Sequence, residues 1–290
     1  MSENIIGIPV HGWSVALENT IHAIEEMKDS RIKNAIIVIT NSGTQFCLPR
    51  IGNKKIIIIA VPDNYYWTAS VDKIFEFALK YDVSNVFILN HDCVPAPNCL
   101  TNMLDFSKKQ SKTIVHAAIA YKSSDIVWWA GNKLRPMRPY KWTYHNQPLS
   151  SLPLHPFETD SCMGQCLLLP ASAMIREYLR IDIFPHYFSD SVFTSLLRRD
   201  GYRLIILPSA VSYTDQGDFE ANREKIRADS WGGVYRALFA TYSNRNIIGT
   251  YFSSVLHQDN KIFGIILGIY MVFGKTLKVL SERLGIIKRL

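Results

Sequence analysis

A chain of 290 residues with 48% hydrophobic and 20% charged residues is long enough for one large domain, or for a domain with an appendage. That composition, without a long low-complexity run, argues against a globally disordered protein. The net charge of +7 lies mostly in residues 261–290, which carry six basic residues and one acid. This distribution argues against nucleic-acid binding and favours contact with an anionic membrane.

The cysteines and the N-terminus bear on the compartment. Five cysteines form no Cys-x-x-Cys pair, and their odd number argues against a disulfide framework, so a reducing compartment is expected. The first ten residues, MSENIIGIPV, lack the basic region and cleavage site of a signal peptide. We therefore expect a cytoplasmic protein at the inner face of the cell membrane.

The first half of the chain alternates strand and helix patterns. Strands are expected at 4–10, 34–40, 55–61, 85–90 and 113–120, and helices at 14–27, at 66–80 and from Pro97 to about 109. The apolar runs are continuous rather than alternating, which is typical of strands buried on both faces of a parallel sheet. The pattern predicts an α/β domain.

The second half begins with an irregular segment, 123–156, which is rich in Trp, Tyr, Pro and Arg. We expect it to form a loop or a small hairpin over the sheet. Strands are then predicted at 165–169 and 202–208, and helices at 171–179 and 190–199. From about Phe219 the chain is predicted to be helical, so we divide it into a domain at 1–217 and a helical extension at 218–290.

An apolar run ends the chain. Ile262–Gly274 contains thirteen uncharged residues between Lys261 and Lys275. A spanning helix needs about 20 residues, so this run is expected to lie in the membrane interface with both lysines at the headgroups. Gly264 and Gly268 have the spacing of a helix-packing face, which is a second possibility.

The fourth predicted strand stops abruptly on polar residues, in the segment VFILNHDCVPAPNCL. Side chains alternate along a strand, so Asn90 and Asp92 should point one way and His91 and Cys93 the other, which is a poor zinc geometry. Two oxygen donors at the carboxyl end of a parallel strand suit Mg²⁺ or Mn²⁺ shared with a substrate diphosphate. Alternatively, Asp92 caps the turn before Pro95.

Five segments follow the first strand in order along the chain: IIVITNSGT (36–44), YWTASVDKIF (66–75), ILNHDC (88–93), MGQCLLLP (163–170) and FPHYFSDSVFTSLLRRDGY (184–202). Together with the first strand, these six segments resemble the motifs of family-2 glycosyltransferases of the GT-A fold, of the rhamnosyltransferase-like type that builds polysaccharides. The segment 184–202 is the strongest single match. The resemblance implies a GT-A fold, a nucleotide-sugar donor linked to UDP, dTDP or GDP, and a divalent metal, Mn²⁺ or Mg²⁺.

The resemblance also implies the reaction and the roles of two acids. The reaction is transfer of a sugar, with inversion, to a hydroxyl of a glycan or lipid-linked acceptor in bacterial surface polysaccharide synthesis. Asp92 is the expected metal ligand, with Asn90 beside it, and Asp190 is the expected general base. Asp190 alternatively caps the helix that follows it. The residues expected to line the donor and acceptor sites are Pro9, His11, Asn41, Trp67, Thr68, Asn90, Gly164, Gln165, His186 and Tyr187.

Departures from the family pattern keep other functions open. Thr40 or Asn41 stands where the family has an acid, and Asp72 replaces an expected Asn. Ser189 replaces the first acid of the family's Glu-Asp pair, so only the second acid, Asp190, is present. These changes leave a non-catalytic sugar-nucleotide-binding relative possible. A nucleotidyltransferase is a further alternative, although PVHGWSV is not the Gly-rich basic loop of that class. The spacing shows no Cys–His pairing for a thiol nucleophile.

Overall fold

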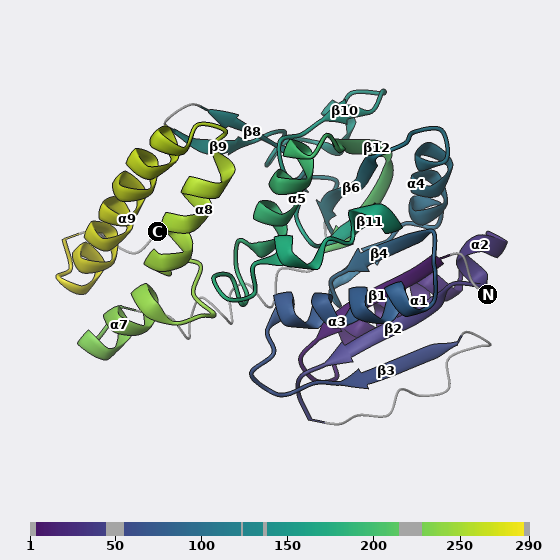
Figure 1. Cartoon of the computed structure of the whole chain (residues 1–290), viewed down its shortest axis with the longest axis horizontal. Coiled ribbons are helices and arrows are strands. Elements are labelled where there is room, and N and C mark those ends of the chain that lie inside the picture. The colour runs from purple at the N-terminus through teal and green to yellow at the C-terminus, as the bar shows by residue number, and fades with distance from the viewer. Residues whose placement is uncertain (1–3, 45–54, 123, 136–137, 215–227, 287–290) are drawn as a thin grey trace.

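The protein is built on one large mixed sheet with helices around it (Figure 1). The computed structural model describes residues 4–44, 55–122, 124–135, 138–214 and 228–286. The strands are β1 (Asn4–Val10), β2 (Ile36–Asn41), β3 (Ile56–Ala60), β4 (Asn85–Leu89), β5 (Cys93–Pro95), β6 (Thr113–Tyr121), β7 (Val127–Trp129), β8 (Asn132–Arg135), β9 (Arg138–Trp142), β10 (Phe157–Glu158), β11 (Cys166–Pro170) and β12 (Arg203–Thr214). The α-helices are α1 (Val15–Glu25), α2 (Ser30–Lys33), α3 (Trp67–Lys80), α4 (Cys99–Ser107), α5 (Ser189–Arg199), α7 (Trp231–Phe239), α8 (Ile247–His257) and α9 (Lys261–Arg283).

The sheet has the order β10-β12-β6-β11-β4-β1-β2-β3. Strands β3, β2, β1 and β4 are parallel to one another, as predicted from their continuous apolar runs. Every residue of β1 is buried, and Ile5, Ile6 and Ile8 have no exposed surface. β11 runs antiparallel between β4 and β6, and β5, β7 and β10 also pair antiparallel with their partners. The carboxyl ends of β1, β2 and β4 therefore meet at one edge of the sheet.

Two predicted elements differ from the structure. The helix expected at 171–179 is wrong: two short 3₁₀ turns, η2 (Ala171–Ala173) and η3 (Arg176–Leu179), stand in its place. The strand predicted at 202–208 is longer and continues as β12 to Thr214. It reaches this length because it pairs with all of β6 and then with β5, which a local pattern does not reveal.

The irregular segment 123–156 contains the expected hairpin, formed by β8 and β9, followed by the 3₁₀ turn η1 (Leu149–Ser151). Its tryptophans pack on the protein. Trp129 is fully buried against His116, with ring centroids 4.4 Å apart, and the Trp128 and Trp142 ring centroids are 5.5 Å apart. These contacts favour a small aromatic cluster over a set of free sugar-stacking rings.

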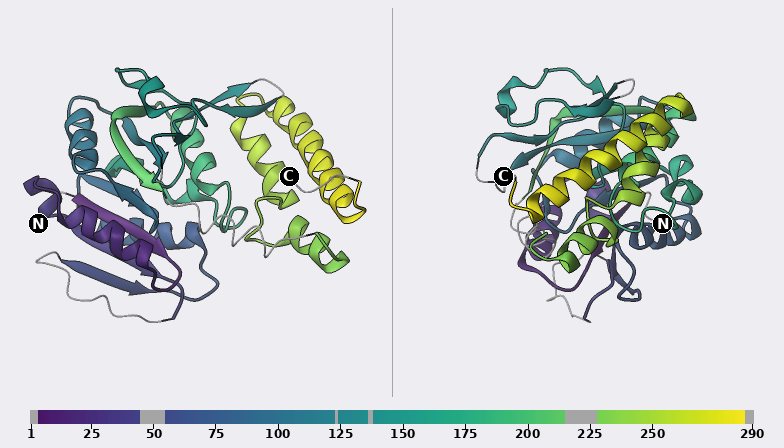
Figure 2. Two further views of the ribbon diagram at one scale, coloured as in Figure 1. Left: turned by 180° about the vertical axis from the view of Figure 1, so that it is seen from behind. Right: turned by 90° about the vertical axis from the view of Figure 1, so that its left-hand side faces the viewer.

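Helices α7, α8 and α9 form a separate group at the end of the molecule opposite α1 and α2 (Figure 2). A Cβ at Gly264 would lie 2.8 Å from the Val255 Cα, and one at Gly268 would lie 2.8 Å from the Tyr251 ring. The two glycines thus form the packing face of α9 on α8, which confirms the second possibility. The predicted boundary at 217/218 lies outside the described residues.

Helix α9 differs from the expected interfacial helix in two ways. It has 23 residues, about 35 Å, so by length and composition it is long and apolar enough to cross a membrane. In addition, Lys275 does not point toward headgroups. Its Nζ donates to the Asn244 carbonyl at 2.7 Å and to the Thr250 hydroxyl at 2.8 Å, on the protein side of the helix.

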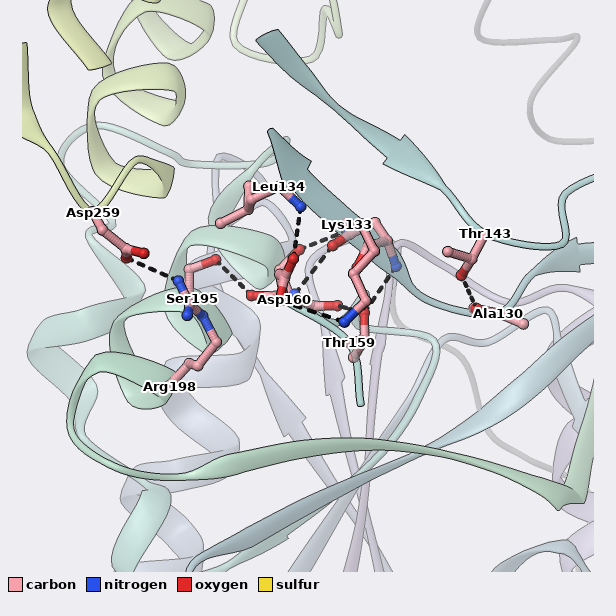
Figure 3. A network of polar contacts seen from close by, with 11 residues as sticks. Ala130, Lys133, Leu134, Thr143, Thr159, Asp160, Ser195, Arg198 and Asp259 are labelled. Carbon is pink, nitrogen blue, oxygen red and sulfur yellow. Dashed lines mark hydrogen bonds and ion pairs between the residues drawn. The ribbon is translucent and has the colours of Figure 1, made fainter. Parts of the chain in front are cut away.

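A polar network joins α5 to the hairpin and to the helical extension (Figure 3). The Leu134 amide donates to the Asp160 carboxylate at 2.7 Å, and the Ser195 hydroxyl donates to the Asp160 carbonyl at 3.3 Å. At the end of α5, Arg198 pairs with Asp259, in the turn between α8 and α9, at 2.9 Å. Helix α5 is therefore held by segments that lie far apart in the sequence.

Candidate active site

The strand-end acid lies in a turn rather than in a strand. β4 ends at Leu89, and Asn90–Asp92 form a turn before β5. The side-chain alternation that we applied to Asn90–Cys93 is therefore wrong, since the strand geometry has already ended. Asp92 is half-buried, and the Thr214 hydroxyl at the end of β12 donates to its Oδ2 at 3.2 Å. Asp92 thus lies between the end of β4 and the start of β5, beside the end of β12.

Trp67 connects the strand end to a second segment of the site. At the start of α3, its indole Nε1 donates to the Asn90 Oδ1 at 2.9 Å. The six-membered ring of the indole lies directly on Gly164, where a Cβ would overlap it. The backbone carbonyl of Gln165 accepts from the Asn90 amide at 3.1 Å. Asn90, Trp67 and the Gly164–Gln165 turn therefore form one packed unit.

The candidate general base, Asp190, is hydrogen-bonded to the packed unit of Asn90, Trp67 and the Gly164–Gln165 turn. Its Oδ2 accepts from the Gly164 amide at 2.9 Å and its Oδ1 from the Ser191 amide at 2.7 Å. Burial raises the pKa of the Asp190 carboxyl above its ordinary value, and the two amides oppose this rise. The N-cap of α5 is Phe188, so Asp190 lies in the first turn of the helix rather than at the cap position.

Two polar atoms beside this unit are buried and lack a hydrogen-bond partner among the described residues: Gln165 Oε1 and His186 Nδ1. Burial lowers the pKa of His186 to about 4, so its ring is neutral near pH 7. The ring lies between Tyr66 and Tyr187, with centroids 5.8 and 4.6 Å away. Buried polar atoms without partners are uncommon in folded proteins, which makes both atoms candidates for ligand contacts.

Thr68 and Asn41 have structural contacts. The buried Thr68 hydroxyl donates to the Phe184 carbonyl at 2.5 Å, which ties α3 to the segment preceding Asp190. The Asn41 Oδ1 accepts from the amides of Gly12 and Gly43 at 2.9 and 3.0 Å. Asn41 therefore shapes the loops after β1 and β2, and direct donor contacts from it and from Thr68 remain predictions.

The end of β1 offers an exposed surface. Pro9 is buried in β1, paired with Thr40 of β2, whereas His11 is exposed and lies 3.2 Å from the Ser42 hydroxyl through its Nδ1. Trp13, which the sequence analysis did not single out, is 49% exposed beside it. An aromatic residue three positions after the end of β1 is the signal that would have identified Trp13 as a candidate for stacking on a ligand ring.

Tyr140 and His257 are further residues that the sequence did not reveal. Burial, and then the charge of Asp190, raises the pKa of Tyr140 to about 12. The Tyr140 and His257 ring centroids are 5.6 Å apart, and burial lowers the pKa of His257 to about 4. The hairpin and α8 thus bring two neutral aromatic groups to the surroundings of Asp190.

Asp92 is the carboxylate at the strand end that could hold a hard metal ion, with the other ligands coming from water and substrate. Within the described residues, no group of three or more His, Cys, Asp or Glu side chains could hold a metal. A single carboxylate at the strand end, Asp92, matches the sparse protein coordination of Mg²⁺ and Mn²⁺, which share phosphates with a substrate. Burial raises the pKa of the Cys93 and Cys162 thiols, which argues against a thiolate nucleophile.

Comparison with known proteins identifies the family of the chain. The sequence model described as "Glycosyl transferase family 2" matches residues 5–166, more than half of the chain. The chain belongs to glycosyl transferase family 2. No curated protein sequence matches it.

The fold of this family-2 glycosyltransferase is similar to that of a solved structure of another protein. The "Crystal structure of GalNAc-T7 with UDP, GalNAc and Mn2+" superposes with a TM-score of 0.56 at 11% sequence identity. The match covers 93% of this chain and 57% of that chain, so the present chain spans a little over half of the other's length. At this identity the likeness establishes the GT-A fold alone, which confirms the predicted fold class.

Proposed function

We propose that this chain is an inverting glycosyltransferase that moves a sugar from a nucleoside-diphosphate sugar to a hydroxyl of a glycan acceptor. Asp190 is the general base, and Asp92 holds Mn²⁺ or Mg²⁺ on the donor diphosphate. The observation that carries the proposal is the continuous contact from Asp190 through Gly164 and Trp67 to Asn90. This chain of contacts supports a single site that contains the half-buried Asp190 carboxylate and the strand-end motif.

Asp190 has the environment of a general base. Its hydrogen bonds come from two backbone amides, which orient the carboxylate without neutralising it, and burial raises its pKa toward the working pH. A carboxylate that accepts the acceptor's hydroxyl proton supports attack on the sugar carbon opposite the leaving diphosphate. A single displacement of this kind inverts the anomeric carbon.

The donor site is proposed at the strand ends. A divalent ion supplies the positive charge that offsets the charge on the leaving diphosphate. Asp92 would hold the ion, while Trp67 would keep Asn90 oriented beside it. The structural neighbour was determined with UDP and Mn²⁺, so among UDP-, dTDP- and GDP-linked donors the UDP-linked ones are tested first.

Contacts to the donor sugar, the acceptor and the nucleobase are proposed for buried polar groups without partners and for exposed side chains. Gln165 Oε1 is buried without a partner and would accept a hydrogen bond from a donor-sugar hydroxyl. His186 and Tyr187 precede Asp190 and would line the acceptor cleft. At the end of β1, exposed His11 and Trp13 would contact the nucleobase.

The helical extension is proposed to bind an anionic membrane, which would bring the enzyme to a lipid-linked acceptor in bacterial surface polysaccharide synthesis, at the cytoplasmic face. Ile269, Tyr270 and Phe273 of α9 are between 61% and 67% exposed, and Trp231 and Tyr235 of α7 are exposed to a similar degree. Large exposed apolar patches mark interaction sites, and the basic charge of residues 261–290 favours anionic lipid.

This membrane role predicts the behaviour of a double variant. Ile269→Glu with Phe273→Glu should lower binding to vesicles containing anionic lipid about 100-fold, since each side chain loses roughly 1.4 kcal/mol or more of apolar burial. Vesicle co-sedimentation measures it. Leu154→Glu, at an exposed apolar residue far from the extension in sequence, is the control and should bind as wild type does. Equal binding by the double variant would contradict the membrane role.

Enzymatic function is tested by turnover. Purified protein with Mn²⁺ and a panel of nucleotide sugars should release a nucleoside diphosphate from one donor class, and chelation should stop the release. An absence of turnover with every donor and acceptor, in a protein that still binds the nucleotide, would favour the non-catalytic relative. The Asp190→Asn variant is the control in this assay and should release much less nucleoside diphosphate.

A further inference from the structure

Lys275 of α9 is a charged residue that points toward the protein rather than toward solvent. The outward side of the helix carries Ile269, Tyr270 and Phe273, whereas this lysine points inward. Its ammonium donates two hydrogen bonds and lies 5.1 Å from the centroid of the Phe188 ring. Taking a lysine out of water is unfavourable unless its contacts compensate, so this arrangement calls for a reason.

Phe188 is a strained residue at the start of α5. Its φ of 73° and ψ of −16° lie in the left-handed region, which a bulky non-glycine residue adopts only where its surroundings impose it. Its carbonyl accepts from the Val192 amide at 2.9 Å and from the Ser191 hydroxyl at 3.1 Å. The conformation of Phe188 therefore fixes the first turn of α5, which contains Asp190.

The helical extension holds the Phe188 ring from one side. Lys275 lies over the ring, and Gly249 of α8 approaches so closely that a Cβ there would be 3.1 Å from it. Phe188 also lines a cavity of about 170 Å³, together with Pro185, Phe239 and Ile248. The ring has space to move into this cavity once the contacts from α8 and α9 are weakened.

We propose that Lys275 is a positioning residue for Asp190: by holding Phe188, it keeps the first turn of α5 in the conformation that presents the carboxylate. The inference rests on the proposed role of Asp190 as general base. It makes the helical extension part of the catalytic apparatus as well as a membrane-binding element. The far end of α5 is held by the same extension, through Arg198 and Asp259.

Hydrogen exchange tests this proposal without any assay of activity. The Gly164 and Ser191 amides both donate to Asp190, so their deuterium uptake reports whether the carboxylate keeps its place. Lys275→Met should accelerate exchange in peptides that contain these amides, and Lys275→Arg should restore slow exchange. Lys278→Met, at an exposed lysine on the same helix, is the control and should exchange as wild type does.

Kinetics separate positioning from a general loss of structure. Lys275→Met should lower the transfer rate constant about tenfold or more, because small misplacements of a catalytic group have effects of up to about 100-fold, while nucleotide affinity stays unchanged. Gly249→Ala should also slow transfer, because its Cβ crowds the Phe188 ring. Alanine favours helix more than glycine does, which offsets the cost of crowding the ring, so the unfolding temperature of this variant should change little.

The pH profile adds a third readout. Burial, and then the charge of Arg245, lowers the pKa of Lys275 to about 8, so the wild-type rate should fall above that pH. Lys275→Arg keeps its charge at high pH, so its transfer rate should not fall above this pH. The other charged or titratable groups on the surrounding elements are Arg245, Lys278, Glu282, Tyr251, His257, His186, Tyr187 and Asp190. Both histidines have a pKa of about 4 and are neutral in this range.

The outcomes distinguish the two proposals. Unchanged exchange at the Gly164 and Ser191 amides in Lys275→Met overturns the positioning role, whatever the activity. A wild-type protein that transfers no sugar overturns the proposed function, while the exchange result still decides whether Lys275 positions Asp190. Faster exchange with a lower rate constant and unchanged nucleotide affinity supports both.

Discussion

Asp190→Asn is expected to reduce sugar transfer by a factor of about 10² to 10⁴, the usual contribution of a general base. The amide oxygen of asparagine can still accept from one of the two backbone amides, whereas its NH2 group cannot accept from the other, so the site should keep its fold at a modest cost in stability. Nucleotide binding should therefore remain at the wild-type level. The measurement is the steady-state rate with donor and acceptor, paired with calorimetric binding of the nucleotide.

The pH dependence gives the same acid a second test. Burial raises the pKa of Asp190 above its ordinary value of 3.8, and only the ionised carboxylate acts as a base. The transfer rate should therefore fall as the pH is lowered through this raised pKa. Asp182→Asn, at an exposed acid in the same segment, should keep both the rate and the profile. Wild-type activity in Asp190→Asn would contradict the role of Asp190 as general base.

Gly164→Ala is expected to have the second-largest effect. Its Cβ would overlap the six-membered ring of Trp67, and since ring and turn are both packed, one of them must move. Overpacking of this kind costs about 1–3 kcal/mol of stability. Displacement of the indole should also break its hydrogen bond to Asn90 and so disturb the strand end. Thermal unfolding and turnover both measure the change.

Two variants serve as controls for Gly164→Ala. Gly274→Ala on α9 has no neighbouring atom within 4 Å of the new Cβ, so it should leave turnover unchanged and stability the same or somewhat higher. Adding Trp67→Phe to Gly164→Ala removes the overlapping ring, which should recover stability but not the contact with Asn90. A Gly164→Ala protein with wild-type stability and turnover would show that the packed unit of Trp67 and Gly164 is not required.

Local patterns in the sequence were sufficient for the parallel half of the sheet. β1 has the predicted limits, and β2, β3 and β4 differ from their predicted limits by one or two residues, because each is a continuous apolar run bounded by polar residues. The same reasoning did not reveal the direction of β11, since an apolar run looks the same in both directions. The helix expected at 171–179 is replaced by two 3₁₀ turns, and Arg176 in the second turn makes a tertiary ion pair with Asp72 of α3 at 2.6 Å that the local pattern does not reveal.

The candidate site was predictable in parts. Asp92 stands out in the sequence by its position after a strand, and Asp190 was identified through the resemblance of residues 184–202 to the family motif. Their connection through Gly164 and Trp67 depends on tertiary packing and could not be read from spacing. The inward lysine of α9 was misplaced for a related reason, because a charge at the end of an apolar run looks like a membrane boundary until its partners are known.

The central claim is that Asp92 holds a metal ion on a nucleoside diphosphate. The most direct measurement is calorimetric binding of UDP, dTDP and GDP, each with and without Mn²⁺, to wild type, Asp92→Ala and the control Asp105→Ala. The account predicts that one nucleotide binds with Mn²⁺, and that this metal dependence is lost in Asp92→Ala alone. If no nucleotide binds the wild type, or if Asp92→Ala binds it with undiminished metal dependence, Asp92 is a turn residue and the account is wrong.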